Sequence, residues 1–354
     1  MINYTKRWSI LSIIAIAILS TVLIIYWNFY RINVQKVDGF KNIELPVTLK
    51  HMLIAGVHSS PWAVLKIDDR RIQYMYTDLR TESIDSILDR LQQIMRSNPQ
   101  AIPHGIYAIS LHDGIHKAYP WPLLGFASTT ELVQRGNAVL IPDFEALLGY
   151  RELFKEVDLA IQQHPWDSKI DKIFWRGTAT GGGPESNNFD SFPRISFLNY
   201  AQHLNYVDAG FTRHQKCFRK PFADQVAEKF PLKPLASKDE SLAYKYLIDI
   251  DGISCSYSRM AWILYSNSLL LKHKTNKVQW YYDRLQPGVH YLSINNDFSN
   301  LHAQFMWAQQ HQAEVVAMTQ NARLLAQQVF SHAATNQALI DAFNRYHKLV
   351  AGRF

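Results

Sequence analysis

The chain has 354 residues, a length that allows two domains of ordinary size. Hydrophobic residues make up 47% and charged residues 19%, a balance that supports a sizeable core and excludes global disorder. Its two cysteines exclude a disulfide scaffold and a cysteine-rich zinc site. The net charge of +7 favours anionic partners, but without a run of five or six basic residues a nucleic-acid tail is not expected.

The N-terminal region contains a long apolar segment. Residues 8–30 carry no charge and lie between Arg7 and Arg31, and about 20 apolar residues are enough to span a bilayer. Trp8 and Tyr30 stand at the ends, where aromatic belts occur. A cleaved signal peptide would have a shorter apolar core followed by a small-x-small site, which is absent. We therefore expect an uncleaved transmembrane helix, with anchor and stalk over residues 1–36.

The basic residues on the two sides of this segment bear on its orientation. Lys6 and Arg7 precede it, and Arg31, Lys36 and Lys41 follow it. The positive-inside rule then favours a cytoplasmic body. The scarcity of cysteines argues against residence in a eukaryotic secretory pathway.

Beyond the stalk, helical and strand patterns alternate, which predicts an α/β fold. A strand at 244–250, a helix at 256–265 and a strand at 268–272 form a βαβ unit, which implies parallel pairing. We place one domain at 37–165 and a second at 166–354. The other expected elements are a helix at 84–95, strands at 105–111, 137–141 and 170–175, a helical stretch at 299–329 and a last helix at 337–350.

Three segments can carry chemistry. In the first, the strand at 170–175 runs into Arg176, Gly177 and Thr178 and then a glycine-rich loop, whose amide groups and arginine can approach a phosphate. The sequence is neither a Walker loop nor a Gly-x-Gly-x-x-Gly motif, because the required lysine and glycine spacing are missing. A mobile polar loop is an equally good interpretation of the composition alone.

The second segment runs from residue 249 to residue 259. Asp251 and Gly252 end a strand, and Ser256, Ser258 and Arg259 open a helix whose N-terminus favours a phosphate. The alternative is a serine that only caps the helix and an arginine that faces solvent. Asp249 and Asp251 lie on the same strand face and can hold Mg²⁺, although a lone pair of carboxylates is a weak signal.

The third segment is His112-Asp113-Gly114, at the end of the strand at 105–111. Ligands of α/β sheets bind at the carboxyl ends of strands, where Asp113 can act as a general base. The simpler alternative is an aspartate in a turn before glycine. No His-Glu-x-x-His pattern for zinc and no Gly-x-Ser-x-Gly elbow is present.

Taken together, these segments resemble glycosyltransferase family 90. The resemblance lies in IFWRGTATGGG, then YKYLIDIDGISCSYSRMAWILYSNSLLLKHK, and then QWYYDRLQPGVHYLSINNDFSNL. It extends in order over about residues 103–350, and the serine-rich DGISCSYS is closer to the bacterial lipopolysaccharide-modifying branch than to the animal protein O-glucosyltransferases.

The resemblance implies a GT-B-like fold: two Rossmann-like domains that face a cleft. It implies an inverting transfer from a UDP-sugar as co-substrate, without a required metal or cofactor, and it makes Asp113 the catalytic residue. One departure concerns Arg259, which stands one residue further from Asp251-Gly252 than in the animal enzymes, so Ser258 can take over a donor contact. The implied donor-binding residues are Arg176, Gly177, Thr178, Arg194, Asp208, Asp251, Gly252, Ser256, Ser258 and Arg259.

These patterns predict a single-pass protein of the bacterial inner membrane. It would transfer a sugar to a hydroxyl of a lipopolysaccharide or another lipid-linked oligosaccharide, with the anchor holding the site near the acceptor. Two alternatives remain open: a non-catalytic membrane-anchored glycan-binding protein, and a glycan kinase, which would lack its usual signature motifs.

Overall fold

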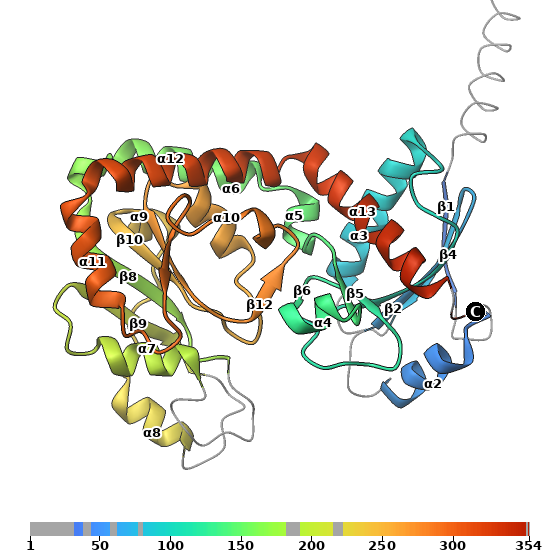
Figure 1. The fold of residues 1–354 in the computed structure, drawn as a ribbon, viewed down its shortest axis with the longest axis horizontal. Coiled ribbons are helices and arrows are strands. Elements are labelled where there is room, and N and C mark those ends of the chain that lie inside the picture. Colours follow the sequence, from blue (N-terminus) through green and yellow to red (C-terminus); the bar gives the residue numbers. More distant parts are fainter. Residues whose placement is uncertain are drawn as a thin grey trace, which may run out of the picture.

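The computed structural model describes residues 32–37, 44–56, 62–76, 81–181, 192–214, 222–351 and 353. They form two α/β lobes, each built around its own sheet (Figure 1). The predicted transmembrane helix at 8–30 lies outside these residues. Within the described ranges, no helix has both the length and the apolar character needed to cross a bilayer.

The first lobe contains a mixed six-stranded sheet with the order β1-β3-β2-β4-β5-β7. Strands β2 and β3 are joined by Asp69 and Arg70 and pair antiparallel, and Asp69 takes a φ of 45° in this tight turn. The sheet therefore departs from the parallel Rossmann-like sheet predicted for this half, because the hairpin reverses the chain at its centre. The strands are β1 (Asn33–Lys36), β2 (Trp62–Asp68), β3 (Arg71–Tyr76), β4 (Gly105–Ser110), β5 (Leu123–Gly125) and β7 (Ala138–Leu140).

Helices cover this sheet because their apolar residues recur at helical spacing. In α3, Ile84, Ile87 and Leu91 are fully buried, which confirms the helix predicted at 84–95. Asp143 caps α5 by accepting a hydrogen bond from the Ala146 N–H at 3.1 Å. The helices in this part of the chain are α2 (Val47–Gly56), α3 (Thr81–Ser97), α4 (Thr130–Gln134) and α5 (Phe144–Leu148).

The second lobe contains a parallel five-stranded sheet with the order β13-β11-β10-β8-β9. The predicted βαβ unit is present, with α10 between two neighbouring parallel strands. The strands are β8 (Ile170–Thr178), β9 (Val207–Arg213), β10 (Tyr244–Asp249), β11 (Leu269–His273) and β13 (Leu292–Ile294).

Helices pack on both faces of this sheet (Figure 1). The helical stretch predicted at 299–329 is two helices, because His311 leaves the helical conformation at φ −123° and ψ 52°. The elements are α6 (Arg151–Gln163), η2 (Trp166–Ser168), α7 (Pro193–Ala201), α8 (Phe222–Lys229), α9 (Lys238–Leu242), α10 (Ser258–Tyr265), η4 (Tyr282–Arg284), α11 (Leu301–Gln310) and α12 (Gln312–Val329).

Two elements connect the lobes. Helix α13 (His332–Val350), grouped with the second domain in the sequence prediction, crosses back and packs on the first sheet (Figure 1). The Tyr346 hydroxyl accepts hydrogen bonds there from the Ala108 N–H at 3.0 Å and Trp121 Nε1 at 2.9 Å. The second connection is an antiparallel pair of short strands, β6 (Ala127–Thr129) and β12 (Lys277–Gln279). The loops that follow β4 and β10 are thereby held near one another.

Candidate functional site

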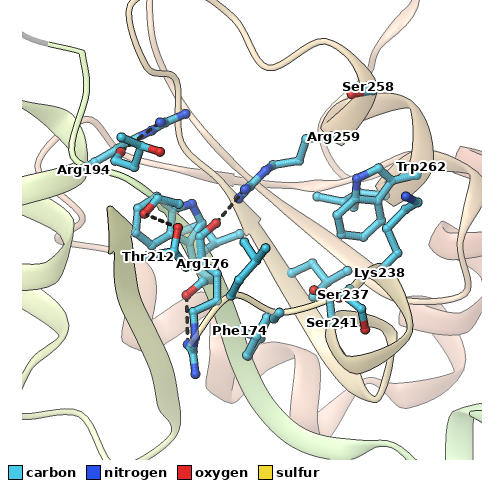
Figure 2. Close-up of a pocket in the computed structure, with 18 residues that line it drawn as sticks. Phe174, Arg176, Arg194, Thr212, Ser237, Lys238, Ser241, Ser258, Arg259 and Trp262 are labelled. Atoms are coloured by element: carbon cyan, nitrogen blue, oxygen red, sulfur yellow. Dashed lines mark hydrogen bonds between the residues drawn. The ribbon is translucent and has the colours of Figure 1, made fainter. Parts of the chain in front are cut away.

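A cavity of about 390 Å³ opens beside β8 and the start of α10 (Figure 2). Parallel strands carry their ligands at their carboxyl ends, and β8 and β10 both end at this place. Ser237, Lys238, Ser241 and Trp262 lie together on one side of the cavity. The predicted donor residues that line it are Arg176, Gly177, Thr178, Arg194, Ser258 and Arg259.

Arg176 forms an ion pair with Asp208, with Nη2 2.9 Å from Oδ1. Lys233 donates to the same oxygen at 2.8 Å, and the Tyr244 hydroxyl donates to the other at 2.9 Å. Burial alone would raise the pKa of the Asp208 carboxyl, but the bonds from Lys233, Tyr244 and Arg176 outweigh it and lower that pKa. The structure thus places the Arg176 guanidinium on Asp208, and Figure 2 shows it turned away from Arg259.

Arg194 joins the ends of two strands. Its guanidinium donates to the carbonyls of Thr178 and Ile250, both at 3.1 Å, and to the Thr180 hydroxyl at 2.7 Å. Gly252 makes this approach possible, because a Cβ at that position would lie 2.9 Å from Arg194 Nη2. The structure thus places Arg194 and Gly252 together beside Thr178 and Thr180, and their role in donor binding stays a prediction.

Among the described residues, Arg259 and Arg194 are two of the four cationic side chains that line this cavity, with Arg176 and Lys238. Arg259 Nη2 donates to the backbone carbonyl of Arg176 at 2.6 Å, as Figure 2 shows. Burial and the neighbouring charge of Arg259 lower the pKa of Arg194 to about 10. Burial lowers the pKa of Arg259 as well, and Asp249 opposes the shift in both arginines. Two cations this close make the site favourable for an anion.

The carboxylates of Asp249 and Asp251 face Lys272. The lysine Nζ lies 3.1 Å from Asp249 Oδ2 and 3.5 Å from Asp251 Oδ1, and both aspartates are fully buried. The Thr275 hydroxyl also donates to Asp251, at 2.5 Å. Asp249 and Asp251, which the sequence suggested as a Mg²⁺ site, therefore face the ammonium group of Lys272. In the described part of the chain, no group of three His, Cys, Asp or Glu side chains could hold a metal ion.

The serine-rich segment is a loop before it becomes a helix. Helix α10 begins at Ser258, two residues later than predicted. The Ser258 N–H donates to Glu145 Oε2 of α5 at 3.2 Å, so a carboxylate already meets this N-terminus. Ser256 is nearly buried and its carbonyl accepts from Gln279 Nε2 at 3.0 Å. Of the two predicted serines, Ser258 lines the cavity, whereas Ser256 is buried behind it and is not among the lining residues.

Asp113 comes from the other lobe and lies against the loop after β10, although it does not line the cavity. It follows β4 and is half-buried. The Tyr257 hydroxyl donates to the Asp113 carbonyl, and a Cβ on Gly114 would meet Ser254 Oγ at 2.5 Å. The loop after β4 thus packs directly on the loop after β10. The structure brings the predicted base into contact with the segment that was predicted to bind the donor.

Sequence reasoning missed several residues of this site. Trp262 and Lys238 line the cavity, and Lys277 Nζ donates to the Gly252 carbonyl at 2.7 Å. Lys272 could have been found, because the predicted pairing of β10 with β11 sets it opposite Asp249. Glu145 gave no local signal, since its contact depends on how α5 packs.

A known protein family matches the part of the chain that contains this site. The model of the family described as Glycosyl transferase family 90 matches residues 112–353, which include Asp113 and the whole cavity. Similar curated proteins include protein O-glucosyltransferase 2 of Danio rerio, 27% identical over 60% of this chain and 39% of that protein. O-glucosyltransferase LpsA of Dichelobacter nodosus is 24% identical over 54% of this chain and 58% of that protein. The chain spans less than two thirds of the length of these relatives.

Solved structures with a similar arrangement are more distant. Anabaena Alr3699/HepE in complex with UDP and glucose is 12% identical, with 75% of this chain and 76% of that chain covered and a TM-score of 0.41. The sucrose-phosphate synthase of Thermosynechococcus elongatus is 13% identical, with 65% and 59% covered and a TM-score of 0.38.

Proposed function

Because the chain belongs to glycosyl transferase family 90, we propose that it is an inverting glycosyltransferase. It moves a sugar from a UDP-sugar to a hydroxyl of a glycan acceptor. The acceptor is a lipopolysaccharide or another lipid-linked oligosaccharide, and the two lobes face the cleft in the GT-B manner. The relatives named as O-glucosyltransferases, one of them LpsA, support this choice of reaction.

The observation that carries the proposal is the contact between the two strand ends. Asp113 stands at the end of β4, and its loop touches Ser254 and Tyr257 of the loop after β10. An acceptor bound against the first lobe and a donor bound in the second-lobe cavity therefore meet beside one carboxylate. Proximity of this kind is what a two-substrate displacement requires.

Displacement at an anomeric carbon needs a base and a stabilised leaving group. The Asp113 carboxylate takes the proton of the acceptor hydroxyl, a contribution worth about 10²–10⁴ in rate. The departing diphosphate gathers negative charge, and Arg194 and Arg259 supply fixed positive charge at the ends of β8 and β10. The reaction requires no metal ion in this proposal, because the arginines do that work.

The cavity has two chemically different sides, which suit the two ends of a nucleotide. Arg194 and Arg259 serve the phosphates. Trp262, with Lys238 and Ser237 beside it, offers an aromatic face and polar atoms for the nucleoside. A volume of about 390 Å³ lies within the range of small-molecule sites.

The decisive test is Asp113→Asn, which removes the base and preserves the shape. Transfer, measured as UDP release from a panel of UDP-sugars with an acceptor, should fall by about 10²–10⁴-fold. UDP affinity, measured by calorimetry without added metal, should stay within about twofold, since Asp113 does not line the cavity. The exposed Asp167, changed to Asn, is the matched control. Turnover at the wild-type rate in Asp113→Asn would remove this residue from the base role.

We also propose that residues 8–30 anchor the protein in the bacterial inner membrane, with the catalytic body in the cytoplasm. The anchor would hold the cleft close to a lipid-linked acceptor. Carbonate extraction of membranes should leave the full chain in the pellet, and protease added to intact spheroplasts should spare the body. Release into the supernatant, or digestion from outside, would overturn the anchor or its orientation respectively.

A further inference from the structure

A short three-stranded ribbon continues directly from Asp113. Ile115 forms a parallel bridge with Ser128 of β6, and its N–H donates to the Ala127 carbonyl at 2.8 Å. On the other side of β6, Ser128 pairs with Val278 of β12. The chain that leaves the proposed base is therefore fixed in register with a strand from the second lobe.

This register sets His116 and Lys277 on one face. Lys277 lies opposite Thr129, and His116 lies one residue beyond the bridge at Ile115 and thus also beside Thr129. Residues in register across a sheet point to the same side, and neighbouring strands are about 4.8 Å apart. The two backbone positions are therefore about 10 Å apart. The electrostatics agree. Partial burial is the largest cause that lowers the pKa of His116, and the charge of Lys277 is the second largest.

The charge of Lys277 is not matched by an acidic partner at bonding distance among the contacts that the structure gives it. Its Nζ donates to the carbonyls of Gly252 and Ile253, at 2.7 and 3.1 Å, and both are neutral. Asp251 attracts it, but that carboxylate is already bonded to Lys272 and Thr275. Half-buried ammonium groups held this way favour an incoming anion.

We propose that the acceptor carries an oxyanion, a phosphate or a carboxylate, that binds between Lys277 and His116 while its reacting hydroxyl lies at Asp113. Lys277 supplies the charge and His116 a ring N–H. Lys117 and Lys274, both exposed on the segments that flank the ribbon, increase the local positive potential. This inference rests on the proposed function only in taking Asp113 to mark the acceptor side.

The test uses the full chain in detergent and three probe sugars: glucose, glucuronate and glucose 6-phosphate. Their affinities are measured by ligand-observed NMR, with and without UDP. At least one anionic sugar should bind about tenfold more tightly than glucose, and the preference should shrink as salt rises. Comparison of glucuronate with glucose 6-phosphate distinguishes a carboxylate from a phosphate.

Lys277→Met should abolish the preference for the anionic probe, and Lys277→Arg should restore most of it. Because Lys277 also holds the Gly252 loop, His116→Asn provides a second variant that leaves those bonds in place, and it should weaken the preference by about threefold. Lys155→Met, on the outer face of α6, removes one exposed charge elsewhere and should change nothing.

Equal affinity for the three sugars, or undetectable binding of all three while UDP binds, would overturn the inference. So would a preference that survives both Lys277→Met and His116→Asn. If the anionic preference holds but UDP does not bind, the inference stands and the proposed donor is wrong. The two failures are therefore separable.

Discussion

Replacing Lys272 with methionine should destabilise the second lobe by about 3–5 kcal/mol, because it leaves two buried carboxylates without their cation. Asp249 and Asp251 are both fully buried, and the lysine stands between them at 3.1 and 3.5 Å. Methionine keeps the approximate length and volume of the side chain, so the loss reports charge and not a cavity. For a unit of about 150–250 residues, about 4 kcal/mol corresponds to roughly 8–16 °C in Tm.

The same variant should show a characteristic pH dependence. In the wild type, burial alone would raise the pKa of Asp249, but Lys272, Ser256 and Arg259 together outweigh it and lower that pKa. This stabilisation is therefore present above the ordinary carboxyl range and is lost as the pH falls through the lowered value. The aspartates in turn raise the pKa of Lys272 against its burial, so its contribution is present below the ordinary lysine range and is lost as the pH rises through the raised value.

Without the ammonium group, burial should instead raise the pKa of the Asp249 carboxyl. Urea unfolding of Lys272→Met at pH 7 and pH 5 should then show a smaller deficit at pH 5, where this carboxyl takes up a proton. The exposed Lys172, changed to Met, is the control for loss of one positive charge. A deficit below about 1 kcal/mol, or one of equal size at both pH values, would refute the reasoning.

Three further predictions concern the two lobes and the loop between them. Burial raises the pKa of Asp143 to about 7, so stability should fall as the pH rises from about 4 to 8; Asp143→Asn should remove up to about 4 kcal/mol of that fall in urea unfolding. Gly252→Ala should displace Arg194 and weaken UDP binding at least about tenfold by calorimetry, because the new Cβ lies 2.9 Å from Nη2. Tyr346→Phe should lower stability by about 1–3 kcal/mol, read as faster hydrogen exchange in β4, since the buried Trp121 indole N–H loses its acceptor.

The strands that carry the site were predictable, because each is a buried apolar run that ends in polar or glycine residues. The strand expected at 244–250 is β10, and the strand expected at 105–111 is β4, each within one residue. The β2–β3 hairpin was not predicted, since its turn is Asp69-Arg70 and lacks the Asn-Gly or Asp-Gly signal. Strands β6 and β12 have three residues each, too few to show a period of two.

The site was predictable as a meeting of segments but not as a set of contacts. The rule that ligands bind at the carboxyl ends of parallel strands places Arg176 and Asp251 near the ends of the neighbouring strands β8 and β10, and the structure agrees. Asp113 follows β4 of the other sheet, and only the packing of the two lobes brings it near them. Whether a charged side chain faces a ligand or a neighbour depends on tertiary packing. Glu145 is an example, because it accepts a hydrogen bond from the start of α10 although it belongs to α5, which is distant in the sequence.

The charges of the cleft separate into two groups once their partners are known. Arg176 forms an ion pair with Asp208, and Lys272 forms one with Asp249. A carboxylate of the protein therefore neutralises each of these two charges. Arg194 and Arg259 are held by carbonyl and hydroxyl oxygens, which orient a guanidinium without neutralising it. Lys277 belongs with them, since it too is held by carbonyls, and it stands on the side of Asp113.

In the proposed reaction, this division assigns a separate set of cations to each of the two substrates. Cations oriented by neutral oxygens at the ends of β8 and β10 would give the proposed donor side its affinity for a diphosphate. A lysine oriented in the same way on the ribbon would give the proposed acceptor side an affinity of its own. Because the ribbon joins β12 to the chain that follows Asp113, it links Lys277 of the second lobe to the proposed acceptor side of the first.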